Sequence, residues 1–580
     1  MEQPKLRGLE KNKEPIIDKI LRLLLAVLLI PICGYGIWWI VQTFMQYGVV
    51  QGSMYVIAGV VGVAFLMAVV VGILGQILFG VFRVGILLLF PAKKLIELLI
   101  WPFKTIIQLS FNAIGKIQKP DSTIANKQPT KFDLYKASKT EKNPFTLHIG
   151  TSTGILYKRK HFTGISEKMK VDLSIPDAAQ NIVVIGGIGA GKTTRIMQPL
   201  LVQTLNQDCG GLIFDVKGDF CQAVDVLAAK AGREVEIIGV HGRGINLLAG
   251  LSPEMASSFL KSAFYLSGGA HGDPFWIDTA VELCRNSFGV LSFVPGHYTL
   301  EGLYSYIFRP EDRERFMMLA QENTDITEQE KRLLRTYLEY YDMIYMNMGD
   351  KTIQGVNASV AQVLSPFQHP ALVDSFCKES TGSANIEEVI NGKIFLVDLP
   401  ISQWGIGAKV IYTLIKLRFF NVMQSRPVRK ELNQERPVFF MCDEYQDIIS
   451  ASKSGLSDLN FWDKSRSAKC IGIISSQSLN SFRSAIGDRA LADTVLQNFR
   501  QKIFFRTEDA DTIQYMEKLA GVAEVERLAS GSTHAQISDM STVDAALIRA
   551  LGENYAIGFF NIDGRAADDV ILLKPLYVDG

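Results

Sequence analysis

The sequence predicts an α/β protein in which a parallel sheet is interrupted by an all-helical insertion and preceded by two transmembrane helices. Short apolar runs of strand length alternate with helical stretches before residue 252 and after residue 385, which is the pattern of a parallel sheet. No strand pattern occurs between these two positions. Two uncharged runs near the N-terminus are each long enough to cross a bilayer. A chain of 580 residues has room for these several domains.

Residues 1–115 are predicted to form a membrane anchor. Spans are expected at about 21–45 and 54–82, because each contains a long run without charged residues. Lys and Arg residues lie before the first span and after the second, but none lies in the short gap between them. The positive-inside rule therefore places both ends of the chain in the cytoplasm. Residues 84–114 are interpreted as a helix at the membrane interface. A third span is the alternative, and it would place the rest of the chain outside the cell.

Residues 116–144 are polar and are interpreted as a linker. The sheet domain is expected in two parts, 145–251 and 386–580, with the all-helical domain at 252–385 between them. Strand patterns occur at 146–149, 155–157, 182–186, 211–215, 235–239, 393–399, 437–442, 470–474, 502–505 and 556–560. Helical patterns in the insertion occur at 253–266, 275–292, 299–308, 310–322, 327–346 and 353–364.

The composition limits the possible partners and cofactors. The formal net charge is +1, so any contact with DNA must be local or arise from assembly around a channel. The seven cysteines are scattered without a Cys-x-x-Cys pair, which favours reduced thiols over a disulfide framework or a zinc site. The histidines are equally dispersed, and no metal site or catalytic triad is predicted from them.

A glycine-rich stretch that follows the first buried strand pattern carries the clearest chemistry. Its sequence, Gly-Gly-Ile-Gly-Ala-Gly-Lys-Thr at 186–193, matches the P-loop pattern G-x-x-x-x-G-K-[ST] at every position. Backbone N–H groups of such a loop hold phosphate oxygens, Lys192 would reach the β- and γ-phosphates, and the Thr193 hydroxyl would bind Mg²⁺. The stretch therefore predicts a site for ATP and Mg²⁺. The residues expected at the nucleotide are Gly186, Gly187, Ile188, Gly189, Ala190, Gly191, Lys192, Thr193 and Thr194.

Two acids follow the strand pattern at 437–442. A P-loop enzyme needs a carboxylate at the end of a neighbouring strand to hold Mg²⁺, and a base beside it to activate water. Asp443 is predicted to be the Mg²⁺ carboxylate and Glu444 the base. The alternative is a strand that simply leaves the core into a polar turn.

Two further polar residues flank the strand pattern at 470–474. Gln477 follows it and would lie beside the γ-phosphate, where its amide could detect that group; a solvated glutamine is the alternative. Arg466 precedes it, and its guanidinium could stabilise the transferring phosphate of a neighbouring subunit or be a solvated surface charge.

The segment Asp-Val-Lys-Gly-Asp at 215–219 closes another strand pattern. Its charges could pair with one another, face the nucleotide or contact a transported polymer. The sequence does not choose among these three roles.

Together these features resemble the type IV coupling proteins, the membrane ATPases that deliver DNA–protein substrates to conjugative type IV secretion channels. The resemblance extends from the two spans to about residue 525. It rests on the two spans with their short external turn, the P-loop at 186–193, Asp-Val-Lys-Gly-Asp at 215–219, Asp-Pro-Phe-Trp at 273–276, Asp-Glu at 443–444, Gln477, and the stretch 478–521. The family often has Asn-Pro-Leu where this chain has Asn246-Leu-Leu, so Asn246 is a weak match.

The resemblance implies a RecA-like motor that forms a hexameric ring in the cytoplasmic (inner) membrane and hydrolyses ATP at its subunit interfaces. Lys192, Glu444 and Gln477 would act in one subunit, and Arg466 has the spacing of the family's trans-acting arginine. The implied cargo is DNA with an attached relaxase, delivered to components of a type IV secretion channel.

Three alternatives remain at this point. The same motor could export protein effectors alone. The chain could be a receptor that binds nucleotide without useful turnover, although the intact Lys192, Asp443 and Glu444 disfavour this. A septal DNA translocase would usually have more spans and a small DNA-reading domain at its C-terminus. The sequence does not identify the cargo, the adaptor or the DNA-contact residues, nor whether a hexamer is stable without substrate.

Overall fold

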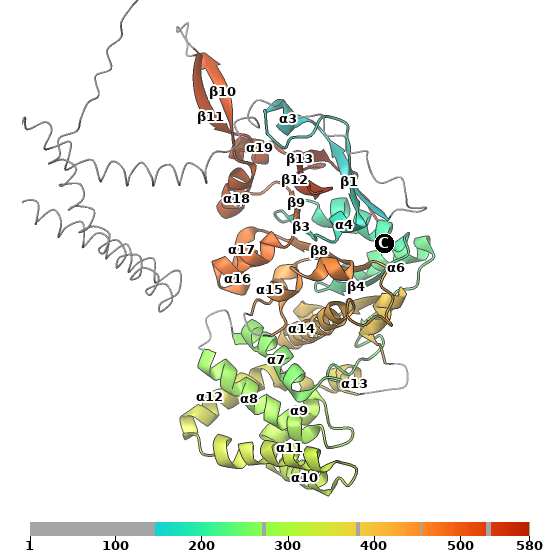
Figure 1. The fold of residues 1–580 in the computed structure, drawn as a ribbon, viewed down its shortest axis with the longest axis vertical. Helices are drawn as coiled ribbons and strands as arrows, with labels where there is room; N and C mark the ends of the chain where they lie inside the picture. The colour runs from blue at the N-terminus through green and yellow to red at the C-terminus, as the bar shows by residue number, and fades with distance from the viewer. Residues whose placement is uncertain (1–144, 269–273, 379–382, 453–454, 529–534, 579–580) are drawn as a thin grey trace, which may run out of the picture. The chain divides into compact units, whose positions relative to one another are not determined.

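The computed structural model describes residues 145–268, 274–378, 383–452, 455–528 and 535–578 (Figure 1). The predicted spans at 21–45 and 54–82, the interfacial segment and the linker lie outside the described residues. Among the residues that are described, no helix is both long enough and apolar enough to cross a membrane. The membrane anchor therefore stays a prediction from the sequence.

Within the described residues, eleven strands form one sheet in the order β2-β1-β13-β12-β9-β3-β8-β7-β4-β6-β5. The strands are β1 (Thr146–Ser152), β2 (Lys170–Ser174), β3 (Ile182–Ile185), β4 (Gly210–Asp215), β5 (Glu236–Gly239), β6 (Ile394–Asp398), β7 (Val438–Cys442), β8 (Cys470–Ser476), β9 (Gln501–Phe504), β12 (Tyr555–Ile562) and β13 (Arg565–Leu572). The strands from β9 to β5 pair in parallel, whereas β12, β13, β1 and β2 extend the sheet by antiparallel pairs. The α/β class is confirmed, but the sheet is mixed rather than wholly parallel.

Both faces of the parallel part are covered by helices, which is why its strands are apolar throughout. On β3, Val183 and Ile185 point into one hydrophobic cluster, and Ile182 and Val184 point into another on the opposite face. The first face is covered by α14 (Ile401–Ser425), α15 (Asp458–Phe461), α16 (Leu479–Ile486), α17 (Arg489–Gln497) and α18 (Ala510–Ala520). The second face is covered by α4 (Ile175–Ala178), α5 (Gln198–Leu205) and α6 (Cys221–Ala231).

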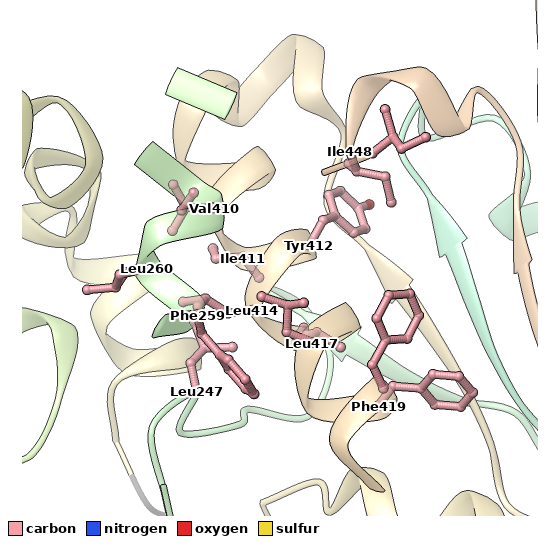
Figure 2. Close-up of a cluster of buried hydrophobic side chains, with 14 of the residues drawn as sticks. Leu247, Phe259, Leu260, Val410, Ile411, Tyr412, Leu414, Leu417, Phe419 and Ile448 are labelled. Atoms are coloured by element: carbon pink, nitrogen blue, oxygen red, sulfur yellow. The ribbon is translucent and has the colours of Figure 1, made fainter. Parts of the chain in front are cut away.

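The described residues between β5 and β6 contain helices and no strand. The helices are α7 (Pro253–Gly268), α8 (Pro274–Leu291), α9 (Leu300–Phe308), α10 (Pro310–Glu322), α11 (Glu328–Glu339), α12 (Asp350–Leu364) and α13 (Pro370–Phe376). The helices α7 to α12 lie where the sequence predicts helices, whereas α13 was not predicted. These helices, drawn in green to yellow in Figure 1, form the all-α domain. It shares a continuous hydrophobic cluster with the sheet domain, because α7 packs against α14 (Figure 2).

One strand prediction is wrong. Residues 155–157 belong to a single helical turn, α3 (Ile155–Lys158), rather than to a strand. The Asp569 carboxylate on β13 accepts hydrogen bonds from the backbone N–H groups of Gly154 (2.5 Å) and Leu156 (2.9 Å). Gly154 has a φ of 70°, which favours glycine and turns the chain out of the extended conformation. A contact from the far end of the sequence thus overrides the local alternation of apolar residues.

The structure also contains strands that are absent from the predicted set, among them β2 and a separate pair. β10 (Val522–Leu528) and β11 (Ala535–Ser541) form a separate two-stranded antiparallel sheet that projects from the neighbouring helices α18 and α19 (Ala545–Ala550) (Figure 1).

Candidate nucleotide-binding and hydrolysis site

The P-loop connects β3 to a helical segment that begins at Thr193 and continues into α5. Gly189 and Gly191 have φ angles of 71° and 89°, which side-chain-bearing residues rarely adopt. The backbone of this loop is therefore folded in the way that a phosphate-binding turn requires. Gly186 is also needed for space, because a Cβ at this position would lie 2.6 Å from the Cβ of Phe505.

Lys192 is buried, and its ammonium group folds back onto its own loop. Its Nζ donates to the carbonyl oxygens of Gly186 at 2.8 Å and Gly187 at 3.5 Å. Burial lowers the pKa of Lys192, while the charges of Glu444 and Asp443 oppose this effect. A buried cation whose hydrogen-bond acceptors are neutral carbonyl oxygens is well suited to bind an anion. The loop and this lysine therefore fit the phosphates of a nucleotide.

The Asp443 carboxylate lies next to the end of the P-loop. Thr193 Oγ1 donates to Asp443 Oδ2 at 2.7 Å, and the hydroxyl of Ser475 donates to the other carboxylate oxygen. β8 lies between β3 and β7 in the sheet, so Ser475 on β8 bridges the strand of the P-loop and the strand of the acids. A hydroxyl and a carboxylate in contact are oxygen ligands of the kind Mg²⁺ prefers beside phosphates. Thr193 and Asp443 fit the predicted Mg²⁺ site.

Glu444 is buried beside Asp443, and both of its carboxylate oxygens accept hydrogen bonds. Lys217 Nζ donates to Oε1 at 2.7 Å, and Gln446 Nε2 donates to Oε2 at 2.6 Å. Burial alone would raise the pKa of the Glu444 carboxyl, but these two hydrogen bonds and the charges of Lys192 and Lys217 outweigh it, so the pKa lies below its usual value. The predicted base is thus held ionised by a lysine.

That lysine belongs to the 215–219 segment, whose role the sequence left open. Lys217 follows β4 and Glu444 follows β7, and these strands are parallel neighbours, so both side chains lie at the same edge of the sheet. The segment is folded around the Asp215 carboxylate, which accepts hydrogen bonds of 2.7 to 2.8 Å from the backbone N–H groups of Gly218, Phe220 and Cys221. The structure shows a contact that was not among the three roles left open, because Lys217 is paired with the predicted base.

Gln477 and Arg466 lie at opposite ends of β8. Gln477 is half-buried and follows Ser476, whose carbonyl oxygen accepts the N–H of Gly186 at 3.2 Å, so it lies beside the start of the P-loop. Arg466 is exposed in a short 3₁₀ helix that precedes β8. The seven residues of β8 span about 20 Å, so the structure does not bring Arg466 to the site of its own chain.

Two residues that sequence reasoning missed support the site. One is Ser475, for which the only signal in the sequence is its place at the end of a strand pattern. The other is Arg195, a buried residue whose guanidinium packs against Gly191 and is held by Asn554 at 2.9 Å and Glu553 at 3.3 Å. Arg195 thereby fixes the P-loop to the turn that precedes β12, which no local pattern could indicate.

Comparison with known proteins agrees with this geometry. Residues 386–546 match the family model of the type IV secretion-system coupling protein DNA-binding domain. In this segment the chain is similar to the type IV coupling proteins. The matched segment includes Asp443, Glu444 and Gln477. A search of curated proteins gives no significant match to the sequence.

Solved structures of the coupling protein TrwB have the same fold. The bacterial conjugative coupling protein TrwBdeltaN70 in an unbound form is 18% identical, with a TM-score of 0.53 over 74% of this chain and 93% of that chain. TrwB in complex with the GTP analogue GDPNP is 18% identical, with a TM-score of 0.53 over 76% of this chain and 95% of that chain. TrwB in complex with ADP and Mg²⁺ is 17% identical, with a TM-score of 0.53 over 75% of this chain and 95% of that chain. At these identities the similarity shows a shared fold.

Proposed function

We propose that this protein is a coupling protein, a membrane-anchored ATPase that uses hydrolysis to recruit DNA with an attached relaxase and move it into a type IV secretion channel. The observation that carries the proposal is the convergence of Lys192, the Thr193–Asp443 pair and Glu444 at one edge of the sheet. This edge joins a phosphate-binding loop, a Mg²⁺ site and a base, which are the parts that ATP hydrolysis requires.

Each residue has a distinct task in this mechanism. The P-loop N–H groups and Lys192 bind and orient the phosphates, and Glu444 accepts a proton from the attacking water. Mg²⁺ bound at Thr193 and Asp443 would neutralise charge on the phosphates. The amide of Gln477 would report the γ-phosphate, and the exposed Arg466 would serve the site of a neighbouring subunit in a hexameric ring.

The cargo and the location are part of the proposal. TrwB is described as a bacterial conjugative coupling protein and has been observed with ADP and Mg²⁺, which supports nucleotide-dependent DNA transfer as the function of this chain. The matched family model is named for DNA binding. The uncharged runs at 21–45 and 54–82 support a place in the cytoplasmic (inner) membrane with both ends in the cytoplasm.

The test is the ATPase rate of the full-length protein in detergent, with and without single- and double-stranded DNA, beside a Lys192→Ala variant. We expect a rate that rises with DNA and that falls at least 100-fold in the variant, a loss of about 3 kcal/mol of transition-state stabilisation. Lys158→Ala is the matched control, because Lys158 is a solvent-exposed lysine paired with Glu167 at the surface.

The outcomes separate the candidate functions. Normal turnover in Lys192→Ala would remove the site assignment. A rate that is indifferent to DNA but raised by a candidate effector protein would identify a protein exporter. Tight nucleotide binding without hydrolysis under any of these conditions would identify a receptor.

A further inference from the structure

Helix α14 contacts the all-α domain on one side and the hydrolysis site on the other. Val410, Ile411 and Leu414 lie on the side that faces α7, next to Leu260 and Phe259 (Figure 2). All of these side chains are buried. α7 and α14 are therefore packed closely enough for a displacement of one to move the other.

The opposite side of α14 presents two polar side chains, Tyr412 and Lys416. They are four residues apart, so they lie on the same face of the helix, one turn from each other. Figure 2 shows Tyr412 on the side of Ile448, away from α7. Neither residue was singled out from the sequence, because polar residues in a long helix are usually solvated. Both are fully buried here.

Tyr412 holds the loop that carries Lys217. Its hydroxyl donates to the backbone carbonyl of Asp215 at 2.6 Å and accepts the N–H of Leu399 at 3.0 Å. Asp215 is the residue around which the 215–219 segment is folded. The hydroxyl therefore fixes the starting point of this segment, two residues before Lys217.

Lys416 holds the loop that carries Glu444. Its Nζ donates to the carbonyl oxygen of Ile448 at 2.5 Å and to Asp458 Oδ2 at 2.6 Å. Asp458 in turn accepts hydrogen bonds from the Tyr445 hydroxyl and from Trp462 Nε1. Tyr445 is the residue next to Glu444, so the network reaches the base through one peptide unit.

The burial of this ion pair favours a positioning role over a stabilising one. Both Lys416 and Asp458 are 0% exposed. Taking two charges out of water is costly, and an apolar pair of similar size is often at least as stable. The pair does, however, impose a fixed geometry, because every bond is directional and leaving one unmade is expensive.

We propose that Tyr412 and Lys416 are positioning residues for ATP hydrolysis, through which α14 sets the relative position of the Lys217 loop and the Glu444 loop and so connects the all-α domain to the site. This inference rests on the proposed ATPase function. In this inference a single helix, α14, couples the all-α domain to Glu444.

The test compares Tyr412→Phe with Tyr306→Phe in the full-length protein. Both variants remove one buried hydroxyl without changing shape, but the Tyr306 hydroxyl has no hydrogen-bond partner among the described residues. Three quantities are measured: kcat for ATP, the affinity for a non-hydrolysable ATP analogue, and the pH dependence of kcat.

We expect Tyr412→Phe to lower kcat about tenfold, the loss that corresponds to one well-formed hydrogen bond. The analogue should bind with unchanged affinity, because the hydrogen bonds of the Tyr412 hydroxyl go to Asp215, Val397 and Leu399, outside the P-loop. The acidic limb of the pH–rate profile should move to higher pH, because the contact between Lys217 and Glu444 loosens. Tyr306→Phe should leave all three quantities unchanged.

A double variant, Lys416→Met with Asp458→Asn, guards against a folding defect by removing both charges together. It should reproduce the loss of kcat and the shift of the acidic limb. Unchanged kcat and an unchanged pH–rate profile in Tyr412→Phe would overturn the inference. It would also be overturned if Tyr412→Phe and the double variant lost affinity for the analogue to the same extent as they lost kcat. A wild type that binds the analogue without turnover would overturn the proposed function and this inference with it. Normal wild-type turnover with unaffected variants would overturn the inference alone.

Discussion

At the scale of the residue, the chemistry of the site depends on how Glu444 is restrained. Its backbone has φ and ψ of 53° and 48°, an unusual conformation for a glutamate, and its side chain is buried. Lys217 and Gln446 occupy both carboxylate oxygens. Strained residues of this kind concentrate at functional sites, because the surrounding structure must hold them in place.

Replacing Lys217 should change the pH dependence of hydrolysis. Lys217 lowers the pKa of Glu444, and the proposed base would be active in its ionised form, so the rate should fall as the pH drops through that pKa. In Lys217→Met the pKa rises, and the acidic limb of the pH–rate profile should move to higher pH. Lys217→Arg keeps the positive charge and is the control, in which the acidic limb should stay near its wild-type pH. Identical pH–rate profiles for Lys217→Met and Lys217→Arg would show that the ion pair does not set the pKa of Glu444.

At the scale of the element, the sheet and the all-α domain are connected by the packing of α7 on α14. Leu260 on α7 is fully buried in this contact, and the same hydrophobic cluster continues to the buried residues of β3 and β4. The interface is therefore part of the core rather than a surface between two separate bodies. Stability should respond to changes there as it does to changes under the sheet.

Leu260→Ala should lower the free energy of unfolding by about 2–5 kcal/mol, because truncation leaves a cavity that the packed helices fill only in part. The measurement is urea-induced unfolding of the detergent-solubilised protein, followed by tryptophan fluorescence. Leu333→Ala on α11 is the matched control, since Leu333 is 46% exposed and its loss should cost little. Equal effects of the two substitutions would contradict a shared core.

At the scale of the whole molecule, the position of Arg466 has consequences for assembly. It lies at the amino end of β8, whereas the P-loop, Asp443 and Glu444 lie at the carboxyl ends of their strands. In the mechanism that we propose, Arg466 therefore acts on a nucleotide bound to another copy of the chain. A single subunit would then have an incomplete site.

Mixing two inactive variants should restore part of the activity. Arg466→Ala retains a working P-loop, and Lys192→Ala retains the arginine, so a mixed ring contains some interfaces with both. We expect each variant alone to be at least tenfold slower than the wild type, and the mixture to exceed the sum of the two. The ATPase rate of co-assembled variants, titrated over their ratio, is the measurement. A mixture no faster than its components would mean that Arg466 does not act between subunits.

The sequence by itself determined the elements and the parts of the site that are local in the chain. Every strand pattern predicted between 182–186 and 556–560 coincides with an observed strand, because buried strands are short apolar runs, although the pair β10 and β11 was missed. The P-loop is one contiguous pattern, and Asp443 and Glu444 could be placed at its edge because parallel strands end on the same side of a sheet. The spans at 21–45 and 54–82 remain predictions from composition.

Only the tertiary structure decided which side chains meet. The partner of Glu444, the bridging role of Ser475 and the buried pair of Lys416 and Asp458 depend on which strands and helices are neighbours in space, and periodicity carries no information about neighbours. The same reason explains the wrong strand at 155–157, where Asp569 imposes a turn from the other end of the chain. Local sequence sets the conformation that a segment prefers, whereas buried polar groups must find partners wherever the fold provides them.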